Sequence, residues 1–214
     1  MKTALFDLDG TLIDSRADLA LAVNLTRADF GLPPKTEDEV VACIGEGMRL
    51  LIEHAIPERP DQWDAMLARQ RVNYLAHCLD RTTLYPGVAE TLRALRAEGW
   101  RLAVVTNKPG PLTRPILEGL GISVFFGAVV GGGDCPVLKP NPAPLLMAAA
   151  QMGATLDADD WMAGDNFTDL EAGRRAGVKR CFCRFGFGTL RGETYDHAID
   201  SMEAFPALVK GEGR

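Results

Sequence analysis

The stretch LFDLDGTLIDS, residues 5–15, gives the strongest indication of the fold. An apolar run predicts a buried strand, and Asp7 and Asp9 come where that strand ends. Residues two apart in a strand point to the same face, so we expect both carboxylates to project together. Gly10 permits a sharp turn, and Thr11 adds a hydroxyl and a backbone N–H. Two neighbouring carboxylates repel each other, so the pattern indicates a positively charged partner nearby.

Composition excludes several classes of function. The chain has 214 residues, of which 47% are hydrophobic and 24% charged, as in an ordinary globular protein. Its net charge of −6 and lack of a basic cluster argue against binding to nucleic acid or a membrane surface. The five cysteines match no zinc-binding spacing and favour reduced thiols. With no signal peptide or membrane span expected, these features predict a cytoplasmic protein, either a monomer or a homodimer.

Apolar runs alternate with amphipathic patterns from about residue 84 onward. This alternation predicts a parallel sheet covered by helices on both faces, with ligands bound outside the carboxyl ends of its strands. Strands are expected over residues 3–8, 101–107, 126–131, 160–164 and 179–185, and helices over residues 87–99, 114–121, 141–153 and 168–177.

Residues 15–82 interrupt this alternation because their patterns are helical throughout. We therefore expect an α/β core domain made of residues 1–14 and 83–214, with a small helical domain of residues 15–82 inserted into it. The two connections, near residues 14–15 and 81–87, are the expected hinges.

Three more polar clusters follow predicted strands. Thr106 and Asn107 end the stretch VVTN, Lys139 lies in VLKPNPAP, and Asp165 and Asp169 lie in MAGDNFTDLEAG. Each cluster alone is also compatible with a turn, a solvated surface charge or a helix cap. Four clusters at the strand ends of one sheet favour a common site.

In this order, the motifs DLDGT, VVTN, LKP and GDNFTD resemble those of the haloacid dehalogenase superfamily of aspartate-nucleophile phosphohydrolases. The resemblance covers essentially the whole chain and is to the branch with a helical cap after the first motif. It implies a Rossmann-like parallel sheet flanked by helices, with residues 15–82 as the cap.

The resemblance also implies the chemistry of the site. Asp7 would form an aspartyl-phosphate, and Asp9 would act as general acid and then as general base. Mg²⁺ would be held by Asp7, by the backbone carbonyl of Asp9 and by Asp165, with Asp169 reaching a bound water or Lys139. The phosphate-binding residues implied are Gly10, Thr11, Thr106, Asn107 and Lys139, and Lys139 also counts as catalytic.

Some branches of the superfamily fit less well than others. Carbon–halogen chemistry does not need the second aspartate, Asp9, and phosphonate cleavage needs a cap lysine, whereas the cap before Arg81 contains only Lys35. Residues 129–146, VVGGGDCPVLKPNPAPLL, are similar to the signature of the phosphoglycolate phosphatase group, which implies hydrolysis of 2-phosphoglycolate to glycolate and phosphate. Sugar-phosphate phosphatase, pyrophosphatase and phosphosugar mutase remain as alternatives, as does a non-catalytic phosphate-binding relative.

The cap loop departs from that group at two positions. Glu46 stands where the group commonly has asparagine, and His54 stands where many members have arginine. A carboxylate beside an anionic substrate would need a compensating charge, for which Arg49 is the candidate. We expect Glu46, Gly47, Met48 and Arg49 to contact the leaving group, although they could equally be exposed residues at the start of a helix.

Overall fold

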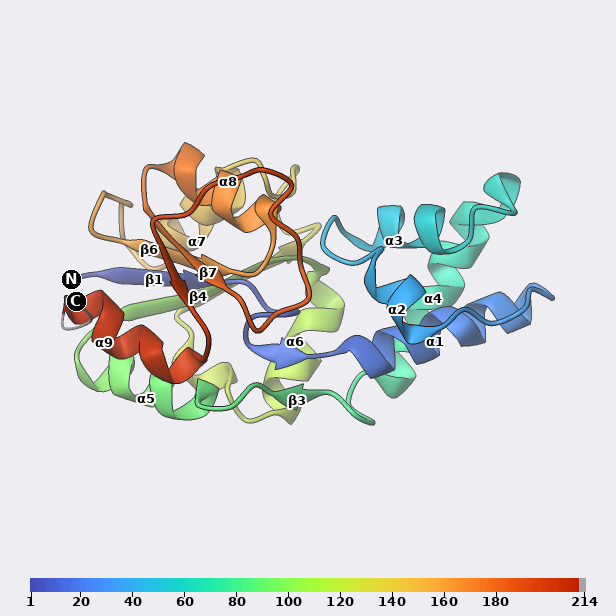
Figure 1. The fold of residues 1–214 in the computed structure, drawn as a ribbon, viewed down its shortest axis with the longest axis horizontal. Helices are drawn as coiled ribbons and strands as arrows, with labels where there is room; N and C mark the ends of the chain where they lie inside the picture. The colour runs from blue at the N-terminus through green and yellow to red at the C-terminus, as the bar shows by residue number, and fades with distance from the viewer. Residues whose placement is uncertain (212–214) are drawn as a thin grey trace.

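The computed structural model describes residues 1–211 and contains a six-stranded parallel sheet (Figure 1). The strand order is β5-β4-β1-β6-β7-β8, and every neighbouring pair is parallel. The strands are β1 (Thr3–Phe6), β4 (Arg101–Pro109), β5 (Ala128–Gly132), β6 (Trp161–Gly164), β7 (Lys179–Cys183) and β8 (His197–Ile199). The predicted α/β class is confirmed.

Helices cover both faces of the sheet. On one face lie α7 (Ala143–Gln151) and α8 (Phe167–Ala176), and on the other α5 (Val88–Ala97), α6 (Gly110–Gly119) and α9 (Phe205–Lys210) (Figure 1). The central strand β1 is buried along its whole length. Because side chains alternate along a strand, Leu5 packs into the apolar cluster under α7 and α8, while Ala4 and Phe6 pack into the other.

The sequence patterns missed two features of the sheet. The edge strand β8 was not expected, because it is short and only its last residue, Ile199, is buried, which leaves no apolar run to detect. Strand β4 continues two residues beyond the expected Asn107, and its register with β5 shifts between Val105 and Pro109.

Residues 15–82 contribute no strand to this sheet. They form α1 (Arg16–Asp29), α2 (Glu37–Val41), α3 (Met48–Ala55) and α4 (Trp63–His77), which extend to one side of it (Figure 1). Short 3₁₀ helices occur at Pro60–Gln62, Ser123–Phe125 and Met202–Ala204. We call residues 15–82 the cap, and the division of the chain into two domains at these positions stays a prediction.

The chain enters and leaves the cap through two adjacent segments. Strand β2 (Ile13–Asp14) pairs antiparallel with β3 (Thr83–Leu84). Asp18, fully buried in α1, accepts hydrogen bonds from the backbone N–H groups of Arg81 and Thr82. The first turn of the cap is therefore fastened to the segment by which the chain returns to the core.

The cysteines are free thiols. None of the five cysteines forms a disulfide, and Cys43 is only half-buried whereas the other four are buried. No helix within residues 1–211 has both the length and the apolar character needed to cross a bilayer.

Candidate active site

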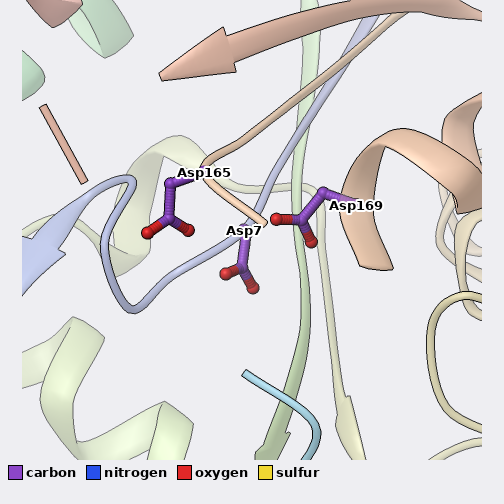
Figure 2. Close-up of side chains that lie close together, drawn as sticks. All are labelled: Asp7, Asp165 and Asp169. Carbon is purple, nitrogen blue, oxygen red and sulfur yellow. The ribbon is translucent and has the colours of Figure 1, made fainter. Parts of the chain in front are cut away.

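Three buried carboxylates converge at the carboxyl ends of the central strands. Asp7 follows β1, Asp165 follows β6, and Asp169 lies in the first turn of α8. Each offers an oxygen atom within 4.8 Å of those of the other two (Figure 2). The parallel topology explains this meeting, because β1 and β6 are neighbours that end on the same edge of the sheet.

Asp165 is held in place by the backbone. Its Oδ2 accepts hydrogen bonds from the N–H groups of Phe187 at 2.9 Å and Gly188 at 2.7 Å. Gly10, with φ +83°, passes so close that a Cβ on it would lie 1.9 Å from Asp165 Oδ2. Glycine at position 10 is therefore required both by its backbone conformation and by this contact.

Asp169 is positioned by the start of α8. Its Oδ2 accepts a hydrogen bond from the N–H of Asn166, while the Asn166 side chain accepts one from Thr168, so the two residues form a reciprocal cap. Its Oδ1 accepts a hydrogen bond from Lys139 Nζ at 2.7 Å. Asp169 is thus fixed by its own helix and turned toward the lysine.

Lys139 joins the cluster from the loop before α7. Its side chain is 1% exposed, and its ammonium donates to Asp7 Oδ1 at 2.8 Å, to Asp169 Oδ1 and to the carbonyl of Val105. Burial disfavours the charged form, but the carboxylates of Asp169 and Asp7 outweigh it and raise the pKa of Lys139. The lysine therefore stays charged between the two aspartates.

One lysine does not balance three carboxylates. Burial raises the pKa of Asp165 well above its ordinary value, and the charges of Asp169 and Asp7 add to the rise. Burial likewise raises the pKa of Asp169 to about 7, against the opposing effect of Lys139. Two negative charges are left uncompensated when all three are ionised. This all-oxygen donor set suits a hard divalent cation such as Mg²⁺.

Asp9, the second aspartate of the first motif, is held apart from the cluster by two side chains. Lys108 Nζ donates to its two carboxylate oxygens at 2.8 and 2.9 Å, and Ser15 Oγ donates to Oδ1 at 2.5 Å. Sequence reasoning missed Lys108 and Ser15 as site residues. The signal for Lys108 was its place directly after Thr106 and Asn107 at the end of a predicted strand.

Thr106 and Asn107 differ in what they leave available. Thr106 Oγ1 accepts a hydrogen bond from the N–H of Lys108, and among the described residues its own O–H donates to no acceptor. The Asn107 amide is fully engaged, since its Nδ2 donates to the carbonyls of Gly45 and Lys139 and its Oδ1 accepts from the Lys139 N–H. Asn107 thus connects the core to the cap loop.

Gly10 and Thr11 use their backbone N–H groups within the turn. Gly10 donates to the carbonyl of Ile13, and Thr11 donates to that of Leu8. The Thr11 hydroxyl is buried and has no hydrogen-bond partner in residues 1–211. Their expected donation to a phosphate therefore stays a prediction.

A pocket opens beside the aspartates, with core and cap residues on opposite walls. Asp7, Asp9 and Lys108 line it from the core, and Ile44, Met48 and Leu51 from the cap. Gly45 and Gly47 also line this pocket. A Cβ on Gly45 would lie too close to Asn166 Nδ2.

The charged cap residues predicted to contact the leaving group have other partners. The charge near Glu46 comes from Arg191, whose Nη2 lies 2.6 Å from Glu46 Oε1, and not from Arg49 as expected. Arg49 is exposed and instead pairs with Glu53 and Asp64. The reason is local, since Glu53 lies one turn further along the same helix. His54 is exposed and does not line the pocket.

Comparison with known proteins identifies the class to which this fold and site belong. The profile of the haloacid dehalogenase-like hydrolase family matches residues 4–183. The chain therefore belongs to that family.

The proteins to which this chain is similar include phosphatases. The chain is 36% identical over 199 residues to a phosphoglycolate phosphatase of Aquifex aeolicus, covering 93% of this chain and 92% of that one. It is 36% identical over 217 residues to the phosphoglycolate phosphatase of Escherichia coli K12, with coverages of 91% and 83%. A crystal structure of a predicted phosphoglycolate phosphatase from Haemophilus somnus matches with a TM-score of 0.90, 31% identity and 97% of both chains. The protein is thus a phosphatase of this family, an enzyme that hydrolyses phosphoric monoesters.

Proposed function

We propose that the protein is a Mg²⁺-dependent phosphatase that hydrolyses 2-phosphoglycolate to glycolate and phosphate through an aspartyl-phosphate. The observation that carries the chemistry is the contact of Lys139 Nζ with Asp7, inside a cluster of three carboxylates. The names of the relatives that are 36% identical over nearly the whole chain support the substrate.

Asp7 is the proposed nucleophile. Lys139 engages Asp7 Oδ1, and no hydrogen bond within the described residues engages Oδ2, which is therefore available to attack phosphorus. Attack forms the bond from Asp7 to phosphorus as the bond from phosphorus to the leaving oxygen breaks. This covalent route divides one difficult displacement into two easier ones.

Asp9 is the proposed acid and base. It gives a proton to the leaving oxygen in the first step and takes one from the attacking water in the second, which releases phosphate and restores Asp7. Such proton transfers contribute about 10²–10⁴-fold to the rate. Ser15 and Lys108 hold the Asp9 carboxylate at the pocket wall.

The phosphoryl oxygens need positive charge and donors. Lys139 and the hydroxyl of Thr106 would supply them, together with Mg²⁺ held by Asp7, Asp165 and the backbone carbonyl of Asp9, with Asp169 near it. When bound, the ion would neutralise charge on the transferring group and orient it toward the nucleophile. The uncompensated charge of the buried carboxylates supports this assignment.

The test is phosphate release from a panel of metabolites in the presence of Mg²⁺, measured as kcat/KM. The panel holds 2-phosphoglycolate, pyrophosphate, sugar phosphates and nucleoside monophosphates, with Asp7→Asn as the inactive control. We expect a clear preference for 2-phosphoglycolate. A preference for sugar phosphates or pyrophosphate would overturn the substrate but leave the chemistry, whereas an active Asp7→Asn variant would overturn the chemistry.

The same proposal includes a cytoplasmic location and a small phosphorylated metabolite as the partner, with no role for nucleic acid or membranes. The absence of a disulfide among the five cysteines and the acidic composition support it.

A further inference from the structure

We propose that Lys108 binds the negatively charged group that a substrate carries next to its phosphate ester, and so selects phosphorylated hydroxy acids over neutral phosphate esters. This inference rests on the proposed function and deepens it. It assigns a specificity role to a residue that the sequence motifs did not single out.

The position of Lys108 fits this role. It lies on β4 two residues beyond Thr106 and lines the pocket, with a side chain that is only 4% exposed. Among the described residues that line the pocket, it is the one that carries a cationic side chain. An anion bound in this pocket therefore has Lys108 as the cationic side chain in the pocket wall.

The distances fit a short substrate. Lys108 Nζ lies 2.8 and 2.9 Å from the two oxygens of Asp9, the residue proposed to protonate the leaving oxygen. In 2-phosphoglycolate the carboxylate is attached to the carbon that bears the leaving oxygen. A leaving oxygen placed against Asp9 therefore brings that carboxylate within reach of the Lys108 ammonium. An ammonium has three donors, and Asp9 accepts two, so one remains for a ligand.

The other cations near the pocket are already committed. Lys139 donates to Asp7, to Asp169 and to the carbonyl of Val105, so it lies beside the proposed nucleophile, where it serves the phosphoryl group and not a second anionic group. Arg191 pairs with Glu46, and Arg49 pairs with Glu53 and Asp64. Lys108 is thus the cation placed to bind a second negative charge on the substrate.

The opposite wall of the pocket supports the same substrate class. Leu19, Ile44, Met48 and Leu51 of the cap present apolar side chains to the pocket. The hydroxyl groups of a sugar would lose hydrogen bonds to water against this wall without gaining partners. A two-carbon hydroxy acid places only a methylene group there and directs its charge toward Lys108.

Lys108 also connects this recognition to the cap. Its Nζ lies 4.4 Å from the centroid of the Tyr74 ring, which is buried in α4. An ammonium over an aromatic face is held by the charge distribution of the ring. The ring keeps the lysine directed at the pocket while the third donor of its ammonium binds the substrate anion.

The experiment compares two substrates that share a two-carbon skeleton and a phosphate ester. One is 2-phosphoglycolate, and the other is 2-hydroxyethyl phosphate, in which a neutral CH₂OH group replaces the carboxylate. Values of kcat/KM are measured for the wild type, for Lys108→Met and for Lys108→Gln, which keeps an N–H donor for Asp9 without the charge. Lys35→Met, which removes a partly buried cap lysine that pairs with Glu39 and does not line the pocket, is the matched control.

We expect the wild type and Lys35→Met to prefer 2-phosphoglycolate. Both Lys108 variants should lose about 10–100-fold in kcat/KM for it, as expected for one charged hydrogen bond. Their loss for 2-hydroxyethyl phosphate should be at least tenfold smaller, so the ratio between the substrates collapses. If Lys108→Met does not fold, as judged by its thermal transition, Lys108→Gln carries the test.

Equal losses for both substrates would overturn the inference, because they would mean that Lys108 only positions Asp9. A wild type that prefers 2-phosphoglycolate beside Lys108 variants with the same preference would also overturn it, and would leave the proposed function intact. A wild type that shows no preference for 2-phosphoglycolate would overturn both.

Discussion

Lys139 is the residue on which the charge balance of the site depends. It is the one described cation that contacts Asp7 and Asp169, and it is almost wholly buried between them. Removing one partner of a buried ion pair is much more harmful than removing both, because it leaves an uncompensated buried charge. The folded protein therefore needs Lys139 even before substrate binds.

We predict that Lys139→Met destabilises the metal-free protein by about 3–5 kcal/mol, because its two carboxylates lose their cation. Urea unfolding with a chelator present measures this, and addition of Mg²⁺ should recover more stability in the variant than in the wild type. The control Lys35→Met loses only an ion pair with the exposed Glu39 and should change stability by no more than about 1 kcal/mol. A metal-free Lys139→Met protein as stable as the wild type would contradict the prediction.

Gly10 is required for a steric reason. A Cβ there would overlap Asp165, the carboxylate fixed by Phe187 and Gly188. We predict that Gly10→Ala weakens Mg²⁺ binding by about 10–100-fold, because it would displace Asp165, one of the proposed metal ligands, from its position. The measurement is the Mg²⁺ concentration that gives half-maximal activity.

Gly31→Ala is the matched control for this change. Gly31 has φ +70°, so alanine suffers the same backbone strain there, but nothing lies within 4 Å of its Cβ position. Both variants should lose about 1–2 kcal/mol of stability from backbone strain, while only Gly10→Ala should need more Mg²⁺. Equal Mg²⁺ requirements in the two variants would show that the overlap with Asp165 has no effect.

At the scale of elements, the sequence predicted those parts of the fold that depend on local pattern. The strands β1, β4 and β6 follow from short apolar runs, and the polar residues at their carboxyl ends indicated a common site. Strand β8 lies at the edge with one buried residue, so its three residues carry no such pattern. Its place in the sheet depends on pairing with β7, which is a long-range contact.

The site was predictable to a similar extent. Asp7, Asp165 and Asp169 meet because the topology of the parallel sheet requires it. Lys108 was missed because a lysine after a strand is ordinarily a solvated surface charge. It is buried here only because Tyr74 of the cap and Asp9 enclose it. The partner of Glu46 could not be predicted either, because Arg191 lies 145 residues further along the chain.

The contact of Glu46 with Arg191 joins the cap loop before α3 to the core loop after β7. The hydrogen bond from Asn107 to Gly45 joins the same cap loop to β4. We predict that Glu46→Gln raises KM by up to about fivefold, because an exposed pair contributes about 0–1 kcal/mol to holding the cap against the core. The turnover number kcat should change less than KM.

A charge reversal distinguishes this contact from a direct effect on substrate. Glu46→Arg alone should raise KM further, and combining it with Arg191→Glu should restore KM toward the wild-type value. Steady-state kinetics on the two single variants and the double variant measure this coupling. Additive effects in the double variant would show that Glu46 does not act through Arg191.

For the whole molecule, the chain order determines how the site is assembled. The cap is inserted directly after the first motif, and β2 and β3 hold its two connections side by side. Asp7 and Asp9 therefore lie at the base of the cap, where Ser15 at the start of α1 contacts Asp9. A change in the position of the cap would act on Ser15 and Tyr74, and hence on the surroundings of Asp9 and Lys108.

The folded protein as a whole should respond to pH through the buried carboxylates. Burial raises the pKa of Asp165 well above its ordinary value and that of Asp169 to about 7, whereas both have ordinary values of about 4 when unfolded. Between these values the folded, metal-free protein binds more protons than the unfolded chain. Its stability from these groups must therefore fall as pH rises from about 4 to 7.

Mg²⁺, as proposed, would bind the ionised carboxylates of the folded state and would therefore oppose that fall. We predict that saturating Mg²⁺ stabilises the protein more at pH 8 than at pH 5, measured as the shift in Tm relative to a chelated sample at each pH. At a hundred times its Kd, a ligand contributes about 2.7 kcal/mol, and proton competition at pH 5 removes part of this. In Asp165→Asn, which lacks one of the carboxylates proposed to hold the ion, the Mg²⁺-induced shift should be small at both values of pH. An equal shift at pH 5 and pH 8 in the wild type would mean that the carboxylates are already ionised at pH 5. Lys139 alone would then suffice to keep the cluster charged without the metal.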